Sequence, residues 1–450
     1  MNKTSISPAA QGISGTARIP QSKPHMQRAL LLSLLANAPS VIVDPAWSSE
    51  ARSLFESVQE FGLNISHHDT NMLGVSGVGK SLSAKSAKVS VVGSAFNFRT
   101  MAAVACLSPG ETVLEGNASM LSRPVREFLS FIPELGGSVD DISDTAHLRV
   151  RVRGSRHLGG TTTVDTRHSS QVLTSVLLVA PLADEAVRIQ CTDPGPVGEG
   201  YVDLTVAMMQ EQGAHVERDG SAFLVRPSTY RSRVHHLASD FTALSYLAGT
   251  VATARAGQLT IADYHPSALS SESEFLRVLD QIGIRTEYDP VQRALHIDRT
   301  SPAAPHVEID GRNIPTVVPT LAAVAPFIDA RVTLRNAAHV NNHKCRRVEV
   351  MVGELRQMGC VIDPTYDSTG RIDGFTTQGQ QSPVGGTAVD SHGDHRIFLS
   401  LATAALGCRR PTVIDGAEHL PASFPDYLDT LAGIGATVTG APARNDLITT

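Results

Sequence analysis

Glu60-Phe61-Gly62-Leu63-Asn64-Ile65 ends an apolar helical stretch on a glycine and continues directly into a short alternating strand. The same arrangement recurs around Gly136, Gly213, Gly283, Gly359 and Gly435, and successive glycines lie 70 to 77 residues apart. A helix that leads straight into a strand favours a left-handed residue at its C-terminal end, and glycine adopts this conformation at the lowest cost. The pattern predicts six structural units, each about one sixth of the 450-residue chain.

Each predicted unit contains a second, more apolar helix upstream of its glycine. Residues 29–36 and 172–179 are too apolar on all sides for a surface helix, so we expect them to be buried. The helix that precedes the glycine has a milder apolar stripe, as in residues 348–358, which is typical of a helix with one exposed face. Solenoid repeats run to ~20–50 residues, so this longer period favours compact units gathered into globular domains.

The length and charge of the chain narrow the class of protein. A single core rarely exceeds ~250–300 residues, so 450 residues predict two or more domains. With 38 Lys and Arg against 44 Asp and Glu, and only 5% aromatic residues, we expect no binding to nucleic acid or to an anionic membrane. No apolar stretch reaches the ~18 residues of a membrane span, and residues 1–7 do not resemble a signal segment.

The cysteines predict neither a disulfide framework nor a metal site. They are odd in number, scattered and without a C-x-x-C pair: Cys106, Cys191, Cys345, Cys360 and Cys408. We therefore expect reduced thiols, no bound metal and a cytoplasmic location.

The openings of the apolar helices carry hydrogen-bond donors and cations. A helix N-terminus has unpaired N–H groups and roughly half a positive charge, so several such ends together bind anions. Arginine forks grip phosphate and carboxylate groups in a bidentate manner. We expect a site for a multiply charged phosphorylated substrate, built with Lys23, Arg28, Arg99, Arg123, Arg347 and Arg396. The alternative for any single cation is that it satisfies a helix cap or a neighbouring carboxylate.

Seven short motifs, in order along the chain, resemble the EPSP synthase family of enolpyruvyl transferases. Residues 21–32 resemble the family's G-S-K-S-x-S-x-R-A-L-L-L opening, and residues 93–99 correspond to its N-[AS]-G-T-x-x-R. The other correspondences are Arg123-Pro124 with R-P, Ser169-Ser170-Gln171 with S-S-Q, residues 201–205 with Y-I-D-L-T, Asp394-His395-Arg396 with D-H-R, and residues 423–427 with the end of K-[ST]-F-P-x-Y.

The resemblance implies an α/β fold of two similar domains. Each domain would consist of three βαβαββ units related by pseudo-threefold symmetry, with the N-termini of the buried helices facing the cleft between the domains. One domain would comprise residues 1–20 and 237–450, and the other residues 21–236, so that the first strand belongs with the C-terminal half. We expect the protein to be a monomer.

The resemblance also implies a reaction and its site residues. In the family's reaction the 5-hydroxyl of shikimate 3-phosphate adds to C2 of phosphoenolpyruvate, C3 is protonated and phosphate then leaves, without a metal or organic cofactor. Phosphoenolpyruvate binding is implied for Lys23, Arg123, Gln171, Arg347 and Arg396. Shikimate 3-phosphate binding is implied for Arg28, Ser169, Ser170, Gln171, Tyr201 and Thr316. The candidate catalytic residues are Lys23, His343, Lys344, Asp394 and His395.

A sister family that acts on UDP-N-acetylglucosamine has a reactive cysteine in the loop before its R-P motif. The corresponding residues 116–122 contain no cysteine, which favours the shikimate branch. We therefore expect the partners of this protein to be phosphoenolpyruvate and shikimate 3-phosphate or a related phosphorylated cyclohexene acid.

Several catalytic positions of the family carry other residue types in this chain. The carboxylate that ends its D-x-N-x-I-P-D motif is Thr316, which cannot act as a general base near neutral pH. In its R-x-K-E-x-D-R motif the glutamate is Lys344 and the preceding lysine is His343. The other replacements are Ala422 for the lysine of K-[ST]-F-P, and Ala95 and Phe96 for the glycine and threonine of N-[AS]-G-T.

There are two hypotheses about which residues replace the family's missing acid–base groups. His343 and Lys344 can form a new pair, because a neighbouring ammonium lowers the pKa of an imidazole and keeps it neutral. Alternatively Asp394, His395 or Asp240 supplies the base, although a carboxylate at a helix opening can also be only a cap. Three functions remain: carboxyvinyl transfer, elimination of phosphate from a shikimate 3-phosphate-like ring without phosphoenolpyruvate, and ligand binding without chemistry.

Overall fold

The computed structural model divides the chain into two compact units. It describes residues 3–82, 88–121, 129–155, 157–193, 195–254, 256–267, 269–299, 304–343, 345–379 and 381–440. One unit, called unit 1 below, comprises Met1–Pro20 and Ala238–Thr450, and the other, unit 2, comprises Gln21–Leu237. No helix in the described ranges is long and apolar enough to cross a membrane.

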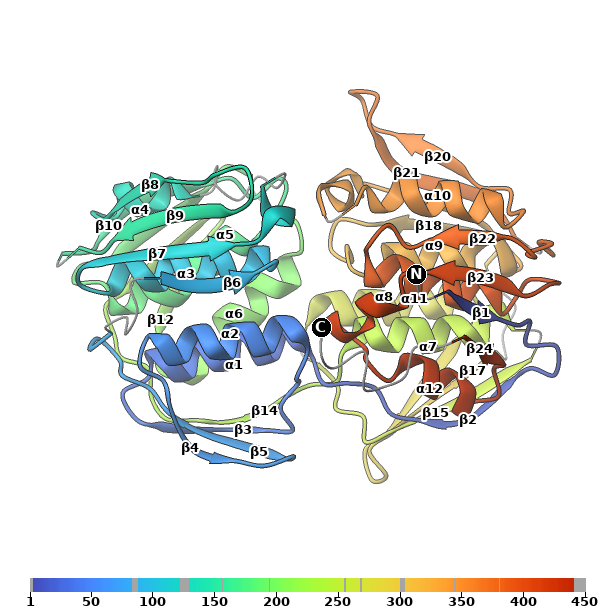
Figure 1. Cartoon of the computed structure of the whole chain (residues 1–450), viewed down its shortest axis with the longest axis horizontal. Coiled ribbons are helices and arrows are strands. Elements are labelled where there is room, and N and C mark those ends of the chain that lie inside the picture. Colours follow the sequence, from blue (N-terminus) through green and yellow to red (C-terminus); the bar gives the residue numbers. More distant parts are fainter. Residues whose placement is uncertain are drawn as a thin grey trace. The chain divides into compact units, whose positions relative to one another are not determined.

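Unit 2 contains three buried helices, three outer helices and three four-stranded sheets in its described part (Figure 1). The buried helices are α1 (Lys23–Leu35), α3 (Ala95–Leu107) and α5 (Gln171–Val179), and the outer ones are α2 (Ser49–Glu60), α4 (Phe131–Glu134) and α6 (Glu199–Glu211). In sheet order, the strands are β14 (Val234–His236), β3 (Pro39–Val43), β5 (Met72–Ser76) and β4 (Asn64–His68); β6 (Lys88–Val92), β7 (Glu111–Gly116), β9 (Leu148–Arg153) and β8 (Ser138–Asp141); and β10 (Gly160–Val164), β11 (Val187–Cys191), β13 (Ala222–Arg226) and β12 (His215–Asp219).

Unit 1 repeats this arrangement in its described residues. Its buried helices are α7 (Phe241–Thr253), α9 (Val318–Val324) and α11 (His395–Ala405), and its outer helices are α8 (Ser270–Gln281), α10 (Arg347–Gln357) and α12 (Tyr427–Gly433). In sheet order, the strands are β2 (Ile13–Ala17), β15 (Gly257–Ala262), β17 (Ala294–Asp298) and β16 (Arg285–Asp289); β18 (His306–Asp310), β19 (Arg331–Arg335), β21 (Ile372–Gln378) and β20 (Asp363–Tyr366); and β22 (Ala388–Asp390), β23 (Thr412–Asp415), β1 (Thr4–Ile6) and β24 (Val438–Thr439).

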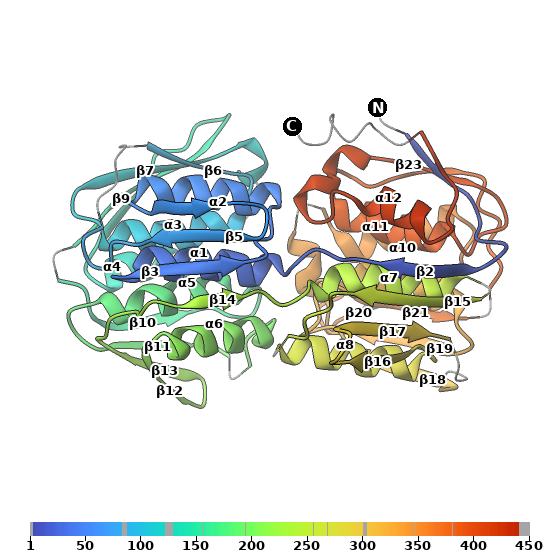
Figure 2. The ribbon, with the colours of Figure 1, turned by 90° about the horizontal axis from the view of Figure 1, so that it is seen from below.

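All six sheets share one topology, in which the first two strands are parallel and each later strand is antiparallel to its neighbour. Three sheets are completed by a strand from a distant part of the chain. Figure 2 shows β2 alongside β15, while β1 pairs with β23 and β24. The repeated α/β architecture confirms the predicted fold class. Short 3-10 helices follow several elements: 118–120, 180–182, 325–327, 338–342 and 417–422.

The predicted burial of the apolar helices is confirmed. Every residue of 29–36 is at most 1% exposed, and residues 172–179 are also buried. The outer helix α10 buries one stripe that includes Val348, Met351 and Leu355. Burying the apolar helices on all sides is possible because the sheets and the outer helices cover them, so each unit has its own core.

The six repeat glycines have the predicted left-handed backbone. Gly62, Gly136, Gly213, Gly283, Gly359 and Gly435 have φ between 83° and 106°. In each case the glycine lies between the end of an outer helix and the next strand, which is the position of a C-terminal cap. The repeat therefore has a structural cause, which is the same helix-to-strand connection made six times.

Local capping and proline geometry set the starts of two buried helices. Helix α9 begins at Val318, so Thr316 lies in the turn before it; Pro319 sits in the first helical turn, where its missing N–H is not needed. Helix α3 begins at Ala95, because the Ser94 hydroxyl accepts from the Asn97 amide at 3.4 Å and caps the helix. Phe96 is therefore a helical residue.

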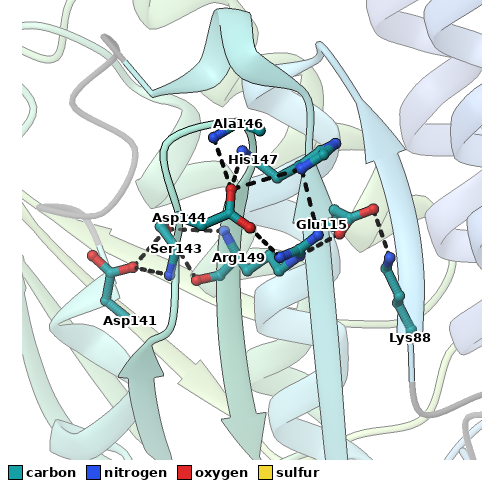
Figure 3. Close-up of polar contacts among 8 residues, drawn as sticks. All are labelled: Lys88, Glu115, Asp141, Ser143, Asp144, Ala146, His147 and Arg149. Carbon is teal, nitrogen blue, oxygen red and sulfur yellow. Dashed lines mark hydrogen bonds and ion pairs between the residues drawn. The ribbon is translucent and has the colours of Figure 1, made fainter.

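Charged side chains cover the outward face of the β6–β7–β9–β8 sheet, as Figure 3 shows. Arg149 on β9 contacts both Glu115 and Asp144, and Lys88 contacts Glu115 at 2.8 Å. The Asp141 carboxylate accepts from the amide of Ser143 at 3.0 Å in the adjoining turn. Because the inward residues of β9 are apolar and its outward residues are arginines, this sheet faces solvent on one side.

Candidate active site

The N-terminal turns of the three buried helices of unit 2 adjoin one another. The Gln27 amide on α1 donates to the Asn97 side-chain carbonyl on α3 at 2.9 Å, and both residues are buried. The Arg99 guanidinium on α3 donates to the side-chain carbonyl of Gln171, the first residue of α5. The unit therefore gathers several helix N-termini and a buried cation in one place, which is the arrangement that favours an anion.

Lys23 opens α1 and is held by a carboxylate that the sequence did not reveal. Its ammonium is 2.9 Å from the Glu50 carboxylate, and the two side chains are 13% and 22% exposed. The Asn97 side-chain amide donates to the Glu50 main-chain carbonyl at 2.8 Å, which fixes the start of α2. Glu50 lies in the first turn of α2, where a carboxylate is favourable, but its distance of 27 residues from Lys23 gave no local signal.

Arg28 is buried among acceptors of its own unit. Its guanidinium donates to the Thr205 hydroxyl at 2.7 Å and to the main-chain carbonyls of Pro24 and Tyr201 at 2.9 and 3.0 Å. The Phe96 ring lies over it, with the centroid 5.4 Å from the guanidinium carbon. Burial lowers the pKa of Arg28 to about 10, so it stays charged at neutral pH. Arg28 thus clamps α1 to α6, with Phe96 as a cover.

The predicted serines lie where α5 and α6 begin. The Ser169 hydroxyl accepts from the Gln171 amide at 3.2 Å, and the buried Ser170 donates to the Gly198 carbonyl at 3.5 Å. Gly198 is left-handed, with φ of 68°, and precedes α6, which carries Tyr201. The structure therefore brings Lys23, Arg28, Ser169, Ser170, Gln171 and Tyr201 into the same unit at neighbouring helix starts; Arg123 lies outside the described residues.

In unit 1 a buried ion pair joins α10 to α11. The Arg347 guanidinium donates to the Asp394 carboxylate at 2.8 Å, and their side chains are 6% and 0% exposed. The other Asp394 oxygen accepts from the Arg396 amide at 2.9 Å and caps α11. Burial alone would raise the pKa of Asp394, but Arg347, His395 and the hydrogen bonds outweigh it and hold the pKa well below its usual range.

The starts of α7, α9 and α11 also adjoin. The Thr242 hydroxyl on α7 donates to the Thr316 hydroxyl at 3.0 Å, and the Arg396 guanidinium on α11 donates to the Thr316 carbonyl at 3.3 Å. Asp240 caps α7 by accepting from the amides of Thr242 and Ala243. Asp240 and Asp394 are thus both capping carboxylates, the alternative raised by their positions in the sequence.

Of the remaining predicted residues of unit 1, His343 and His395 lie close to this ion pair. His343 precedes α10 and is exposed, whereas His395 is buried at the first position of α11. The pKa of His343 is lowered, because nearby protein desolvates the imidazolium and Arg347 adds a like charge. Ala422 is nearly buried and has no ionisable group, and Lys344 lies outside the described residues.

These contacts indicate what each unit can do chemically. Arg99 and Arg396 bring positive charge to the N-terminal turns of buried helices, which suits phosphate and carboxylate groups. Lys23 and Arg347 are each paired with a carboxylate, Glu50 and Asp394 respectively. In the described ranges, no three His, Cys, Asp or Glu side chains are grouped as a metal site would require. Two repeated α/β units, each with a cation in the first turn of a buried helix, are suited to binding small polyanions.

Comparison with known proteins identifies the family. The family model for EPSP synthase (3-phosphoshikimate 1-carboxyvinyltransferase) matches residues 8–431, so the chain belongs to the EPSP synthase family. It is 27% identical over 433 residues to the 3-phosphoshikimate 1-carboxyvinyltransferase of Halobacterium salinarum strain ATCC 29341, covering 95% of this chain and 98% of the relative. It is 29% identical over 419 residues to that of Methanoculleus marisnigri, covering 92% and 96%.

A solved structure shows the same fold. The EPSP synthase of Acinetobacter baumannii matches with a TM-score of 0.81 at 20% identity, and the match covers 98% of this chain and 100% of that chain. The agreement in fold spans both units.

Proposed function

We propose that this protein transfers the carboxyvinyl group of phosphoenolpyruvate to the 5-hydroxyl of shikimate 3-phosphate or a closely related phosphorylated cyclohexene acid. The observation that carries the proposal is the family match over residues 8–431. Lys23 at the start of α1 and Arg396 at the start of α11 support it, since both substrates carry phosphate and carboxylate groups. The reaction belongs to the shikimate pathway, which leads to aromatic amino acids.

Phosphoenolpyruvate would bind to the cations, and the ring acceptor to the serine and tyrosine positions. The first group consists of Lys23, Arg123, Gln171, Arg347 and Arg396. The second consists of Ser169, Ser170, Gln171, Tyr201 and Thr316, with Arg28 contributing by clamping α1 to the helix that carries Tyr201. We propose that closure of the two domains brings both sets of residues to the same bound pair of substrates. We also propose that the protein works as a monomer in the cytoplasm.

The addition step requires one proton to leave the acceptor hydroxyl and one to reach C3 of phosphoenolpyruvate. The elimination step then returns a proton from C3 to its donor as phosphate leaves C2 and the double bond re-forms. Thr316 has no pKa that would let it act as a base. Asp394 is a poor base because its ion pair with Arg347 keeps its pKa low, so the carboxylate resists taking up a proton. His343 stays neutral at physiological pH because its pKa is lowered, so it can accept the hydroxyl proton. Lys344, its neighbour in the chain, would donate the proton to C3, while Lys23 and His395 would stabilise charge.

A second candidate function is elimination of phosphate from a shikimate 3-phosphate-like ring without phosphoenolpyruvate. The stacking of Phe96 on Arg28 favours it, because that ring fills space beside the start of α3 where the family has a small residue. A third candidate, binding without chemistry, is motivated by Thr316, Lys344 and Ala422 together. The three candidates predict different requirements for phosphoenolpyruvate.

One assay separates these candidates. The purified protein is mixed with shikimate 3-phosphate, with and without phosphoenolpyruvate, and phosphate release and product mass are followed. Release that requires phosphoenolpyruvate, with a product heavier by the carboxyvinyl group, supports transfer. Release without it supports elimination. Calorimetric binding without any release supports the third candidate, and failure of shikimate 3-phosphate to bind would refute the assignment of the acceptor.

A further inference from the structure

The segment that leads into α11 has an unusual backbone. After β22 the chain passes through Ser391, His392 and Gly393 before the capping residue Asp394. His392 and Gly393 are both left-handed, with φ of 51° and 70°; this conformation is uncommon for residues other than glycine, although histidine adopts it more readily than most. The His392 amide donates to the Asp390 carboxylate at 2.7 Å, and the Asp394 amide donates to the Ser391 carbonyl at 2.9 Å. The position of α11 thus depends on a tight turn.

Helix α10 contacts this turn through two buried residues, Arg347 and Glu354, which lie about two helical turns apart. At its first residue, Arg347 binds Asp394. Farther along, Glu354 accepts from the Asp390 amide at 3.1 Å with one oxygen and contacts the His392 imidazole at 3.0 Å with the other. One helix therefore fixes both ends of residues 390–394.

Glu354 is a buried carboxylate whose side chain is 8% exposed. A buried carboxylate is costly unless it is hydrogen-bonded, and both Glu354 oxygens find partners on the turn. The left-handed backbone at His392 places the imidazole against that carboxylate. Contact with Glu354 thus accounts for a backbone conformation that a non-glycine residue otherwise disfavours.

We propose that Glu354 and His392 are positioning residues for the Asp394-His395-Arg396 motif. They act through the backbone of residues 390–394 and do not touch substrate. One part of this inference rests on the proposed function: the expectation that Glu354 and His392 affect the binding of phosphoenolpyruvate, because they position Arg396. Its structural part, the ordering of the turn by Glu354, is independent of the reaction.

The test combines amide hydrogen exchange with calorimetry on the full chain. Glu354→Ala removes both contacts, whereas Glu354→Gln keeps an acceptor for the Asp390 amide. His392→Gly keeps the left-handed backbone at lower cost and removes only the imidazole, so this variant keeps the test valid if Glu354→Ala folds poorly. Glu349→Gln is the matched control, because Glu349 lies on the same helix but pairs with Arg346.

We expect Glu354→Ala and His392→Gly to speed exchange in the peptide 388–398 and to weaken phosphoenolpyruvate binding about 10-fold or more, with shikimate 3-phosphate binding little changed. Glu354→Gln should recover most of the loss, and Glu349→Gln should match the wild type. Unchanged exchange in both variants would overturn the proposal, as would faster exchange with wild-type affinity for phosphoenolpyruvate. If the wild type binds no phosphoenolpyruvate, the proposed function fails, and exchange alone then decides whether Glu354 orders the turn.

Discussion

Arg347 and Asp394 form an ion pair at 2.8 Å in which neither side chain is more than 6% exposed. The carboxylate also caps α11, so one residue neutralises the guanidinium and begins a buried helix. Removing one partner of a buried pair leaves an uncompensated charge, which usually costs more than the pair itself contributes.

We predict that Arg347→Met lowers the free energy of unfolding by about 3–5 kcal/mol in urea denaturation. The double variant Arg347→Met with Asp394→Ser should lose less, because serine keeps the cap and no buried charge remains. As a surface control, Glu217→Gln removes an exposed pair with Arg226 and should change stability by about 0–1 kcal/mol. A double variant no more stable than Arg347→Met alone would contradict the charge argument.

The repeat glycines allow a second prediction about stability. Gly435→Ala should cost about 1–2 kcal/mol, since φ of 101° is disfavoured although no atom crowds the new methyl group closely. Gly136→Ala should cost more, because the added Cβ would lie 2.8 Å from the His157 carbonyl oxygen. Gly353→Ala in the exposed middle of α10 should instead stabilise by about 0.5–1 kcal/mol. Equal losses at all three positions in chemical denaturation would refute the role of the backbone angle.

The fold could be predicted largely because its signals are local. A glycine such as Gly62 must be left-handed wherever a helix turns directly into a strand, and the apolar residues 29–36 can only be buried. The starts of α3 and α9 were less predictable. They depend on Ser94 acting as a cap and on Pro319 fitting the first turn, which are choices among several neighbouring polar or proline residues.

The buried carboxyl of Glu272 allows a prediction about pH. Burial of the Glu272 side chain raises its pKa to about 7, and the nearby Asp240 charge adds to this rise. The carboxylate accepts hydrogen bonds from the Tyr264 hydroxyl and the Ser267 amide, which lower the pKa by less than burial raises it. The folded state therefore binds the proton more tightly than the unfolded state. The resulting stability is complete below the ordinary pKa near 4.5 and is lost as the pH rises through about 7.

We expect the free energy of unfolding to fall by roughly 3 kcal/mol between pH 4.5 and pH 8 from this group. Glu272→Gln carries no charge; its one carbonyl oxygen can accept from the Ser267 amide while its NH2 group donates to the Tyr264 hydroxyl oxygen. It should therefore remove this part of the slope and be more stable than the wild type at pH 8. Denaturation at several pH values measures the slope, with the exposed Glu287→Gln as the control. A Glu272→Gln protein with the wild-type slope would show that another group titrates.

The candidate site was predictable in its cations but not in their partners. The helix openings indicated Lys23, Arg28 and Arg347 because cations beside helix N-termini suggest an anion site. Glu50 and Phe96 were missed as partners, since they lie far from Lys23 and Arg28 in the sequence and only packing brings them together. The same holds for His392 and Glu354, which are 38 residues apart.

His343 provides a prediction about catalysis. Its lowered pKa keeps the imidazole in the base form at pH values below the ordinary 6.5, so kcat/KM for carboxyvinyl transfer should stay level as the pH falls through 6.5 and decline only in more acidic solution. His343→Gln keeps a polar side chain of similar reach but cannot take up a proton, and should lower kcat by about 10²–10⁴-fold.

His306→Gln, at an exposed histidine on β18, should leave both rate and pH profile unchanged. Rates from phosphate release and affinities from calorimetry separate loss of the base from loss of binding, because only the rate should change in His343→Gln. A variant with the wild-type rate, or a wild-type profile that bends near pH 6.5, would exclude His343 as the base and leave the proton to another group.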